Sequence, residues 1–203
     1  MKKKISAKKI AVIGMFSALG TVLALLGKVI PSVAGFLDYD PKDVIVCICG
    51  FMLGPIYSFA VSLISSFIEF IWFGSSGIIG FFMNVISTAS FACTAAFIYK
   101  RKRTFKKAII GLVVGVLFMT ATMVLWNVIV TPYYMHVPRE TVIGMLPTVF
   151  IPFNLAKGTI NAILTVILYK PLVKALRRMR LVEEREIRKT EEKEGNDGEN
   201  TGI

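Results

Sequence analysis

The amino-acid sequence predicts an all-α membrane protein with six transmembrane helices, a short second helix and both termini in the cytoplasm. Hydrophobic residues make up 55% of the chain and charged residues only 18%. The charges gather at the two ends and in one internal loop, as a bilayer requires, because a charge at the centre of a membrane helix costs about 2.5–3.5 kcal/mol. Strand-like alternation of polar and apolar residues is absent, which favours helices over a β-barrel.

Six apolar segments, separated by proline, glycine or basic residues, predict the six helices. They comprise residues 10–30, 44–53, 56–73, 78–99, 108–130 and 149–168. The second segment is too short to cross a bilayer at about 1.5 Å per residue. We therefore expect it to form a helical hairpin with the third segment, broken at Gly54-Pro55. We expect the sixth helix to end before Lys170-Pro171.

Three basic clusters determine the predicted orientation. Residues 2–9 contain five lysines, residues 100–107 contain six basic residues and residues 170–180 contain five. Six crossings place all three clusters on the same side of the membrane. The positive-inside rule assigns that side to the cytoplasm. The sequence therefore predicts a multi-pass membrane protein with both termini in the cytoplasm.

The same distribution of charge divides the chain into three parts. We expect a basic cytoplasmic N-terminus (residues 1–9), a six-helix transmembrane domain (10–180) and a charged cytoplasmic tail (181–203). The tail carries 4 basic and 8 acidic residues. Such a composition is typical of a disordered segment.

Several classes of function find no support in the sequence. The net charge is +11, but the basic residues flank apolar spans as membrane anchors do, which argues against a nucleic-acid partner. Cys47, Cys49 and Cys93 lie in apolar runs, and His136 has no other ligand at a metal-binding spacing. Neither a phosphate-binding loop nor a nucleophile–base set occurs. We therefore expect no enzyme and no metal site, and any ATPase would be a separate subunit.

Polar side chains within the predicted spans indicate where a small molecule would bind, because they are costly in a membrane. They are Glu69, Asn84, Asn127, Asn154, Lys157 and Asn161. The last three follow an i, i+3, i+7 spacing, which places them on one face of the sixth helix. Two interpretations remain open: Glu69 pairs with Lys157 while the asparagines join helices, or the group lines a binding cavity near the outer side.

The loop after the first helix also allows two interpretations. Residues 36–43 hold three aspartates, a tyrosine and a proline. They form either a solvated turn in which Asp43 caps the second helix, or a lid over the cavity with Tyr39 as its aromatic face. Gly80 would let a ligand approach the backbone closely. Trp126, beside one of the asparagines, would stack on a flat ligand.

Five stretches together carry a resemblance to a known family. They are Tyr-Asp-Pro-Lys-Asp-Val (39–44), Gly-Pro (54–55), Gly-Phe-Phe-Met-Asn (80–84), Trp-Asn (126–127) and Pro-Phe-Asn-Leu-Ala-Lys-Gly (152–158). From about residue 10 to residue 178 the chain resembles the substrate-binding S-components of energy-coupling factor (ECF) vitamin transporters, and most closely the riboflavin-specific ones.

This resemblance implies six helices around one vitamin near the extracellular face, with the loop after the first helix as a cap. It implies high-affinity riboflavin binding, with riboflavin as the transported ligand and no cofactor. Its implied partners are a transmembrane coupling subunit and two ATP-binding subunits. The small residues Gly14 and Ala18 of the first helix, with Ala11 nearby, would dock on the coupling subunit. The whole S-component would topple in the membrane to turn its site inward.

Together the residues and the resemblance give a set of predicted substrate-binding residues. They are Tyr39, Asp40, Glu69, Gly80, Asn84, Asn127, Asn154 and Lys157. Carboxamides and a lysine suit the carbonyl and imide edge of the flavin ring, and an aspartate such as Asp40 suits the loop or the ribityl hydroxyls.

Three alternatives stay open at this point. The first is an S-component for another vitamin, such as thiamine or a pteridine. The second is a stand-alone secondary transporter that couples transport to protons through Glu69. The third is a structural or assembly protein without a ligand, in which the polar residues only stabilise the fold.

Overall fold

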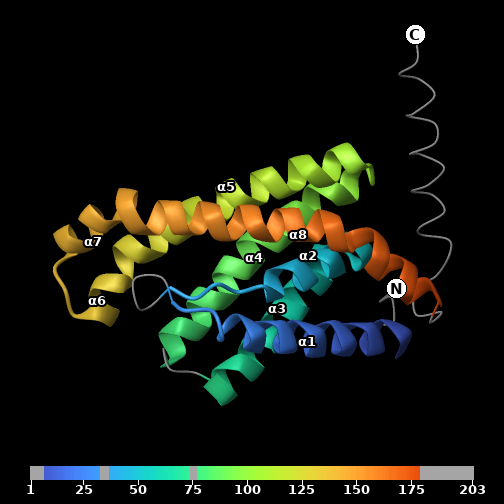
Figure 1. The fold of residues 1–203 in the computed structure, drawn as a ribbon, viewed down its shortest axis with the longest axis horizontal. Helices are drawn as coiled ribbons and strands as arrows, with labels where there is room; N and C mark the ends of the chain where they lie inside the picture. The colour runs from blue at the N-terminus through green and yellow to red at the C-terminus, as the bar shows by residue number, and fades with distance from the viewer. Residues whose placement is uncertain (1–6, 33–36, 74–76, 179–203) are drawn as a thin grey trace, which may run out of the picture.

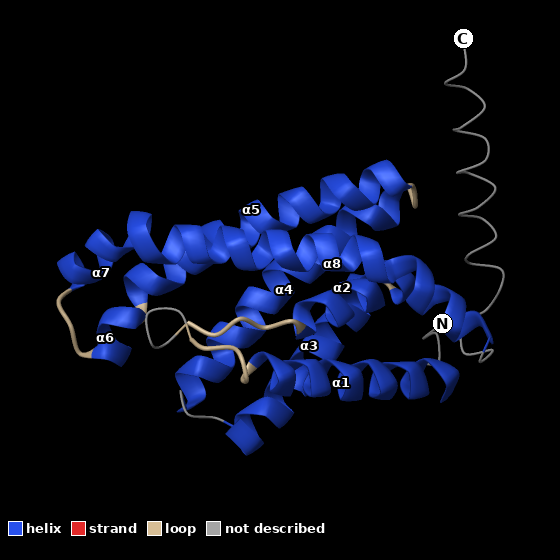
Figure 2. Cartoon of the chain, viewed as in Figure 1, coloured by secondary structure: helices blue, strands red, loops and turns tan. Residues whose placement is uncertain are grey.

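The computed structural model describes residues 7–32, 37–73 and 77–178, and every element in these ranges is helical (Figure 2). In chain order the elements are α1 (Ala7–Gly27), α2 (Lys42–Leu53), α3 (Pro55–Phe73), α4 (Gly77–Arg101), α5 (Phe105–Ile129), α6 (Thr131–Met135), α7 (Arg139–Met145), a π-helical turn (Leu146–Phe150) and α8 (Ile151–Arg178). The predicted tail, residues 181–203, lies outside the described residues.

Five stretches of helix are long and apolar enough to cross a membrane. They are Lys9–Gly27, Pro55–Trp72, Gly77–Arg101, Phe105–Ile129 and Arg139–Pro171. Large apolar side chains such as Ile56, Trp72 and Leu117 are strongly exposed on their outer faces. Charged Lys42 and Asp43 are completely buried. Because apolar groups cover the outside and charges lie inside, the chain is a multi-pass membrane protein.

The short helix α2 lies at the centre of the molecule, in contact with α1, α3, α4 and α8 (Figure 1). Its 12 residues span about 18 Å, less than a bilayer core. Its first eleven residues are all buried. The helix ends at Gly54, whose φ of 109° favours glycine, and Pro55 begins α3. The predicted short helix and its break at Gly54-Pro55 therefore agree with the structure.

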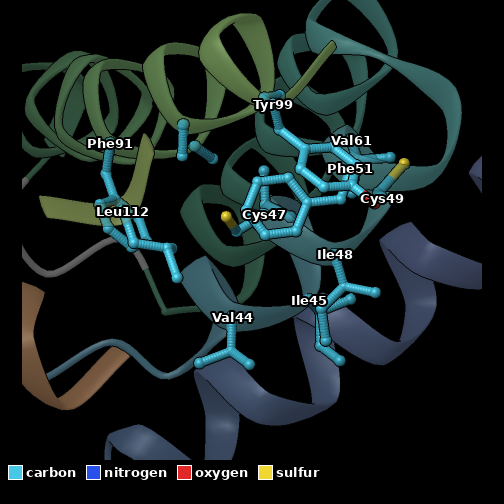
Figure 3. Packing of buried hydrophobic residues seen from close by; sticks show 14 of the residues in the cluster. Val44, Ile45, Cys47, Ile48, Cys49, Phe51, Val61, Phe91, Tyr99 and Leu112 are labelled. Carbon is cyan, nitrogen blue, oxygen red and sulfur yellow. The ribbon is translucent and has the colours of Figure 1, made fainter. Parts of the chain in front are cut away.

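The apolar core surrounds α2. Figure 3 shows Phe51 of this helix against Tyr99 of α4, and Cys47 between this pair and Phe91 of α4 with Leu112 of α5. Cys47 and Cys49 are free and fully buried, as expected for cysteines that serve as small apolar packing residues.

Two expectations about the last segments were wrong. The predicted sixth helix begins at residue 149, but α7 and the π-helical turn lead into α8 without a break. The candidate membrane span therefore begins at Arg139. Pro171 does not end the helix, because α8 continues through it to Arg178. A proline removes one backbone hydrogen bond and bends a helix, but a long membrane helix tolerates the loss.

The ends of the helices separate the molecule into two poles (Figure 1). The start of α1, the α4–α5 connection and the end of α8 lie at one pole. The residues at 37–41, α6 and α7 lie at the other. Lys100 and Arg101 in the last turn of α4 complement its helix dipole, and Thr104 caps α5 by accepting a hydrogen bond from the Lys107 backbone N–H. The basic cluster at 100–107 therefore occupies the first pole.

Candidate functional site

A cavity opens at the second pole, between the 37–41 loop and helices α1, α3, α4, α5 and α8. It holds about 870 Å³ of space free of protein atoms, including its solvent-open mouth. All eight predicted substrate-binding residues line it: Tyr39, Asp40, Glu69, Gly80, Asn84, Asn127, Asn154 and Lys157. Residues from opposite ends of the sequence thus meet around one space.

Two asparagines are held by backbone carbonyl oxygens four residues earlier in the chain. Asn127 Nδ2 donates to the Met123 carbonyl oxygen at 2.7 Å, and its Oδ1 accepts from the Thr131 hydroxyl at 2.7 Å. Asn154 Nδ2 donates to the Phe150 carbonyl oxygen at 2.8 Å. Both side chains are buried. Because these bonds fix the amide planes, each side chain presents a defined orientation at the cavity wall.

The hypothesis that Glu69 pairs with Lys157 was wrong. Glu69 Oε2 lies 2.6 Å from Lys42 Nζ and accepts from Asn84 Nδ2 at 2.9 Å, while Glu69 Oε1 lies 3.4 Å from Lys28 Nζ. Lys42 is 0% exposed and extends from the first turn of the central helix toward α3. Lys42 therefore holds the carboxylate that the hypothesis assigned to Lys157.

Asp40 completes this buried ion cluster. Its Oδ2 lies 2.6 Å from Lys42 Nζ, and its Oδ1 accepts from the Lys42 backbone N–H at 3.1 Å. Lys42 therefore has two carboxylate oxygens at 2.6 Å, one from Asp40 and one from Glu69. Full pairing of this kind is what burial of a charge requires.

Asp43 does not cap α2, contrary to one interpretation of the loop. The residue before the helix is Pro41, without a side-chain cap. The Asp43 carboxylate instead accepts from Thr88 Oγ1 at 2.6 Å and from Asn161 Nδ2 at 3.1 Å, and lies 3.6 Å from Lys157 Nζ. It joins α2 to α4 and α8.

The 37–41 loop is tied down on both sides of the cavity. The Tyr39 hydroxyl donates to Asn161 Oδ1 at 2.7 Å, and Asn161 Nδ2 donates to the Asp40 carbonyl oxygen at 3.0 Å. Asp38 pairs with Lys28 at 2.6 Å. Leu37 is buried against side chains of α7 and the π-helical turn. The loop is therefore packed over the site, which disfavours the interpretation as a solvated turn.

Electrostatics keep the Tyr39 hydroxyl a donor. Burial, together with the negative charges of Asp43 and Asp40, raises the pKa of Tyr39 to about 12. Asp38, by contrast, keeps a lowered pKa although burial acts to raise it, because Lys28 and Ser32 donate hydrogen bonds to its carboxylate. The loop thus keeps its hydrogen bond and its ion pair at neutral pH.

Sequence reasoning missed some residues around the cavity and misplaced another. Lys28, Ser66 and Phe70 line the cavity, but each is unremarkable in its own segment. Lys42 gave a signal, since a lysine at the head of an apolar segment needs a partner. Trp126 lines a smaller neighbouring cavity, with Ile79 and Tyr134, instead of the main one.

The small residues predicted to dock a partner are not among the residues that line this cavity. Ala11, Gly14 and Ala18 are exposed on α1. A Cβ atom added to Gly14 would meet no atom within 4 Å. They form an open strip where another helix is able to approach closely.

Fold and cavity together define a membrane protein with a polar cavity near one end of a helical bundle. The model of the family described as the substrate-specific component of ECF transporters matches residues 8–169, and the chain belongs to this family of transporter components.

Individual relatives agree with this assignment. The chain is 31% identical to the riboflavin transporter RibU of Staphylococcus aureus (strain TCH60), over 85% of this chain and 94% of the relative. It is 30% identical to the riboflavin transporter FmnP of Bacillus subtilis (strain 168), over 75% and 85%. A solved structure, reported as the S component of a bacterial ECF transporter, superposes with a TM-score of 0.71 at 31% identity and covers 83% of this chain and 97% of that chain.

Proposed function

We propose that this protein binds riboflavin in the cavity at the second pole and delivers it across the plasma membrane as the substrate-specific component of an ECF transporter. The observation that carries the proposal is that all eight residues predicted for the ligand line one cavity. The similarity to two riboflavin transporters supports the choice of vitamin. Two ATP-binding subunits and a transmembrane coupling subunit would supply the energy.

The chemistry of the cavity suits a flat, polar, uncharged ring. Asn84, Asn127 and Asn154 offer carboxamides, and Lys157 offers an ammonium group, for the carbonyl and imide edge of the flavin. Phe70 and Phe81 from α3 and α4 supply aromatic surface at the wall. Gly80 leaves room for the ring near the backbone of α4.

The two acidic residues among the eight have a structural role. Asp40 and Glu69 are engaged with Lys42, so they hold the cavity wall and the loop in place. Tyr39 keeps the loop on α8 through Asn161. Because Glu69 is committed to lysines, its pairing gives no support to a proton-coupled stand-alone transporter.

In the membrane, the basic pole would face the cytoplasm and the cavity would face outward. Six crossings would include α2 with its short length, and both termini would be cytoplasmic, with the division at residues 1–9, 10–180 and 181–203. The strip of Ala11, Gly14 and Ala18 would dock on the coupling subunit. Its exposure and the lack of any obstruction near Gly14 support this placement.

Binding to the purified full-length protein tests the proposal directly. Riboflavin added at nanomolar concentration should lose its fluorescence on binding, and mass spectrometry should find flavin among copurifying molecules. Asn154→Ala should weaken binding about tenfold to a hundredfold, because a buried hydrogen bond to the ring is lost. Thr159→Ala, on the exposed face of the same helix, is the matched control and should not change affinity.

Other outcomes would decide for the alternatives. Tight binding of thiamine or a pteridine, with no response to riboflavin, would show that the protein is an S-component for that other vitamin. Riboflavin uptake that continues in cells lacking the ATP-binding subunits, and stops in Glu69→Gln, would favour a proton-coupled transporter. Absence of any ligand, with variants affecting only stability, would leave a structural protein.

A further inference from the structure

Asp43 is fully buried in the first turn of α2 and is not among the residues that line the cavity. Its carboxylate nevertheless reaches two other helices. Oδ1 accepts from Thr88 Oγ1 of α4 at 2.6 Å, and Oδ2 accepts from Asn161 Nδ2 of α8 at 3.1 Å. The same Oδ2 lies 3.6 Å from Lys157 Nζ. One carboxylate thus stands directly behind the cavity wall.

The distance to Lys157 distinguishes this lysine from its neighbour. Lys42 Nζ has two carboxylate oxygens at 2.6 Å, so its charge is matched within the protein. Lys157 Nζ has an ion pair only with Asp43 among the described residues, at a distance longer than a normal hydrogen bond. Asp43 therefore attracts the ammonium group without using its N–H donors. Those donors remain for a molecule in the cavity.

Asp43 also orients Asn161. The Asn161 Nδ2 group donates to Asp43 Oδ2 and to the Asp40 carbonyl oxygen. Two acceptors on this side turn Oδ1 the other way, where it accepts from the Tyr39 hydroxyl at 2.7 Å. The carboxylate thereby determines which atom of the amide faces the 37–41 loop.

We propose that Asp43 is a positioning residue for the ligand site: its charge holds the Lys157 ammonium group at the cavity wall, and its contact with Asn161 keeps Tyr39 and the loop over the cavity. Asp43 sets riboflavin affinity without touching riboflavin. The inference rests on the proposed function, because it assumes that Lys157 contacts the ligand.

A double-mutant cycle on the full-length protein tests the effect of the Asp43 charge on Lys157. Asp43→Asn keeps the shape of the side chain and removes its charge, and Lys157→Ala removes the group on which that charge acts. Riboflavin dissociation constants are measured by fluorescence quenching for the wild type, both single variants and the double variant. Asp43→Asn should weaken binding about tenfold in the wild-type background but about twofold or less when Lys157 is absent.

A second double-mutant cycle combines Asp43→Asn with Tyr39→Phe, which keeps every charge. It tests the effect of Asp43 on Tyr39 through Asn161, and the two changes in riboflavin affinity should not be additive. Ser58→Ala is the control for a structural role. It removes another buried hydrogen bond to α2, from Ser58 Oγ to the Val46 carbonyl oxygen at 2.9 Å. It should lower the melting temperature of the ligand-free protein and leave riboflavin affinity unchanged, with and without Lys157.

The failures of the two proposals are distinguishable. A wild-type protein that does not bind riboflavin refutes the proposed function. A wild-type protein that binds riboflavin, with an Asp43→Asn penalty of equal size in the presence and absence of Lys157, overturns the positioning role whatever the Tyr39 cycle gives. Unchanged affinity in Lys157→Ala overturns it as well.

Discussion

The three lysines near the cavity differ in how completely their charges are matched. Lys42 is enclosed by two carboxylates at 2.6 Å, Lys157 faces one at 3.6 Å, and Lys28 is partly exposed beside Asp38 at 2.6 Å and Glu69 at 3.4 Å. A charge in a low-dielectric interior must be paired, whereas an exposed pair contributes little. Lys42 therefore stabilises the fold, and Lys157 keeps donors for a ligand.

This difference predicts the effect of removing each structural lysine. Lys42→Met leaves the Asp40 carboxylate buried without this cation and leaves Glu69 with only the more distant Lys28. It should lower the free energy of unfolding by about 3–5 kcal/mol. Lys28→Met, the control, should cost about 1 kcal/mol or less, because Lys28 is partly exposed and Glu69 keeps its closer partner Lys42. Thermal unfolding of the purified proteins measures both. Equal melting temperatures for the two variants would contradict the prediction.

At this scale the sequence predicted which residues meet but not how they pair. The spacing of Asn154 and Lys157 places both on one face of a helix, and the structure places both at the cavity. The partner of Glu69 depends on which helices are neighbours. Lys42 comes from a helix whose central position no local pattern reveals, so the pairing with Lys157 was the wrong choice.

Among the elements, the boundaries that depend on turn residues were predictable and those that depend on packing were not. Gly54-Pro55 marks the break between α2 and α3 because glycine accepts the positive φ there and proline suits a first helical turn. The π-helical turn at Leu146–Phe150 has no comparable sequence signal. It leads into α8 at Phe150, whose carbonyl oxygen holds Asn154, so it belongs to the construction of the site.

Close packing of α4 on α5 gives a prediction at the same scale. A Cβ atom on Gly115 would lie 2.8 Å from the Phe91 carbonyl oxygen, a backbone atom that does not rotate away. Gly115→Ala should therefore separate the helices and cost about 1–3 kcal/mol of stability. Gly144→Ala makes the same change where no atom lies within 4 Å, and should be neutral or slightly stabilising because alanine favours a helix. Comparison of melting temperatures checks the pair, and a stable Gly115→Ala protein would show that α4 and α5 tolerate separation.

For the whole molecule, the arrangement of the poles supports the orientation that the charge pattern predicts. The α4–α5 connection, which carries the basic cluster at 100–107, lies at the pole opposite the 37–41 loop and α7 (Figure 1). A helical bundle with the exposed basic cluster at 100–107 at one pole and the polar cavity at the other has two chemically different faces for the two sides of a membrane.

Labelling of single cysteines in intact cells tests this orientation. Lys102 lies between α4 and α5, Glu140 lies in the first turn of α7, and both are exposed. In a background with Cys47, Cys49 and Cys93 replaced by alanine, Glu140→Cys should react with a membrane-impermeant maleimide added outside. Lys102→Cys should react only after the membrane is permeabilised, because the positive-inside rule predicts a cytoplasmic position for its cluster. Riboflavin binding by both variants would show that they keep the native fold, and the reverse labelling pattern would place the cavity on the cytoplasmic side.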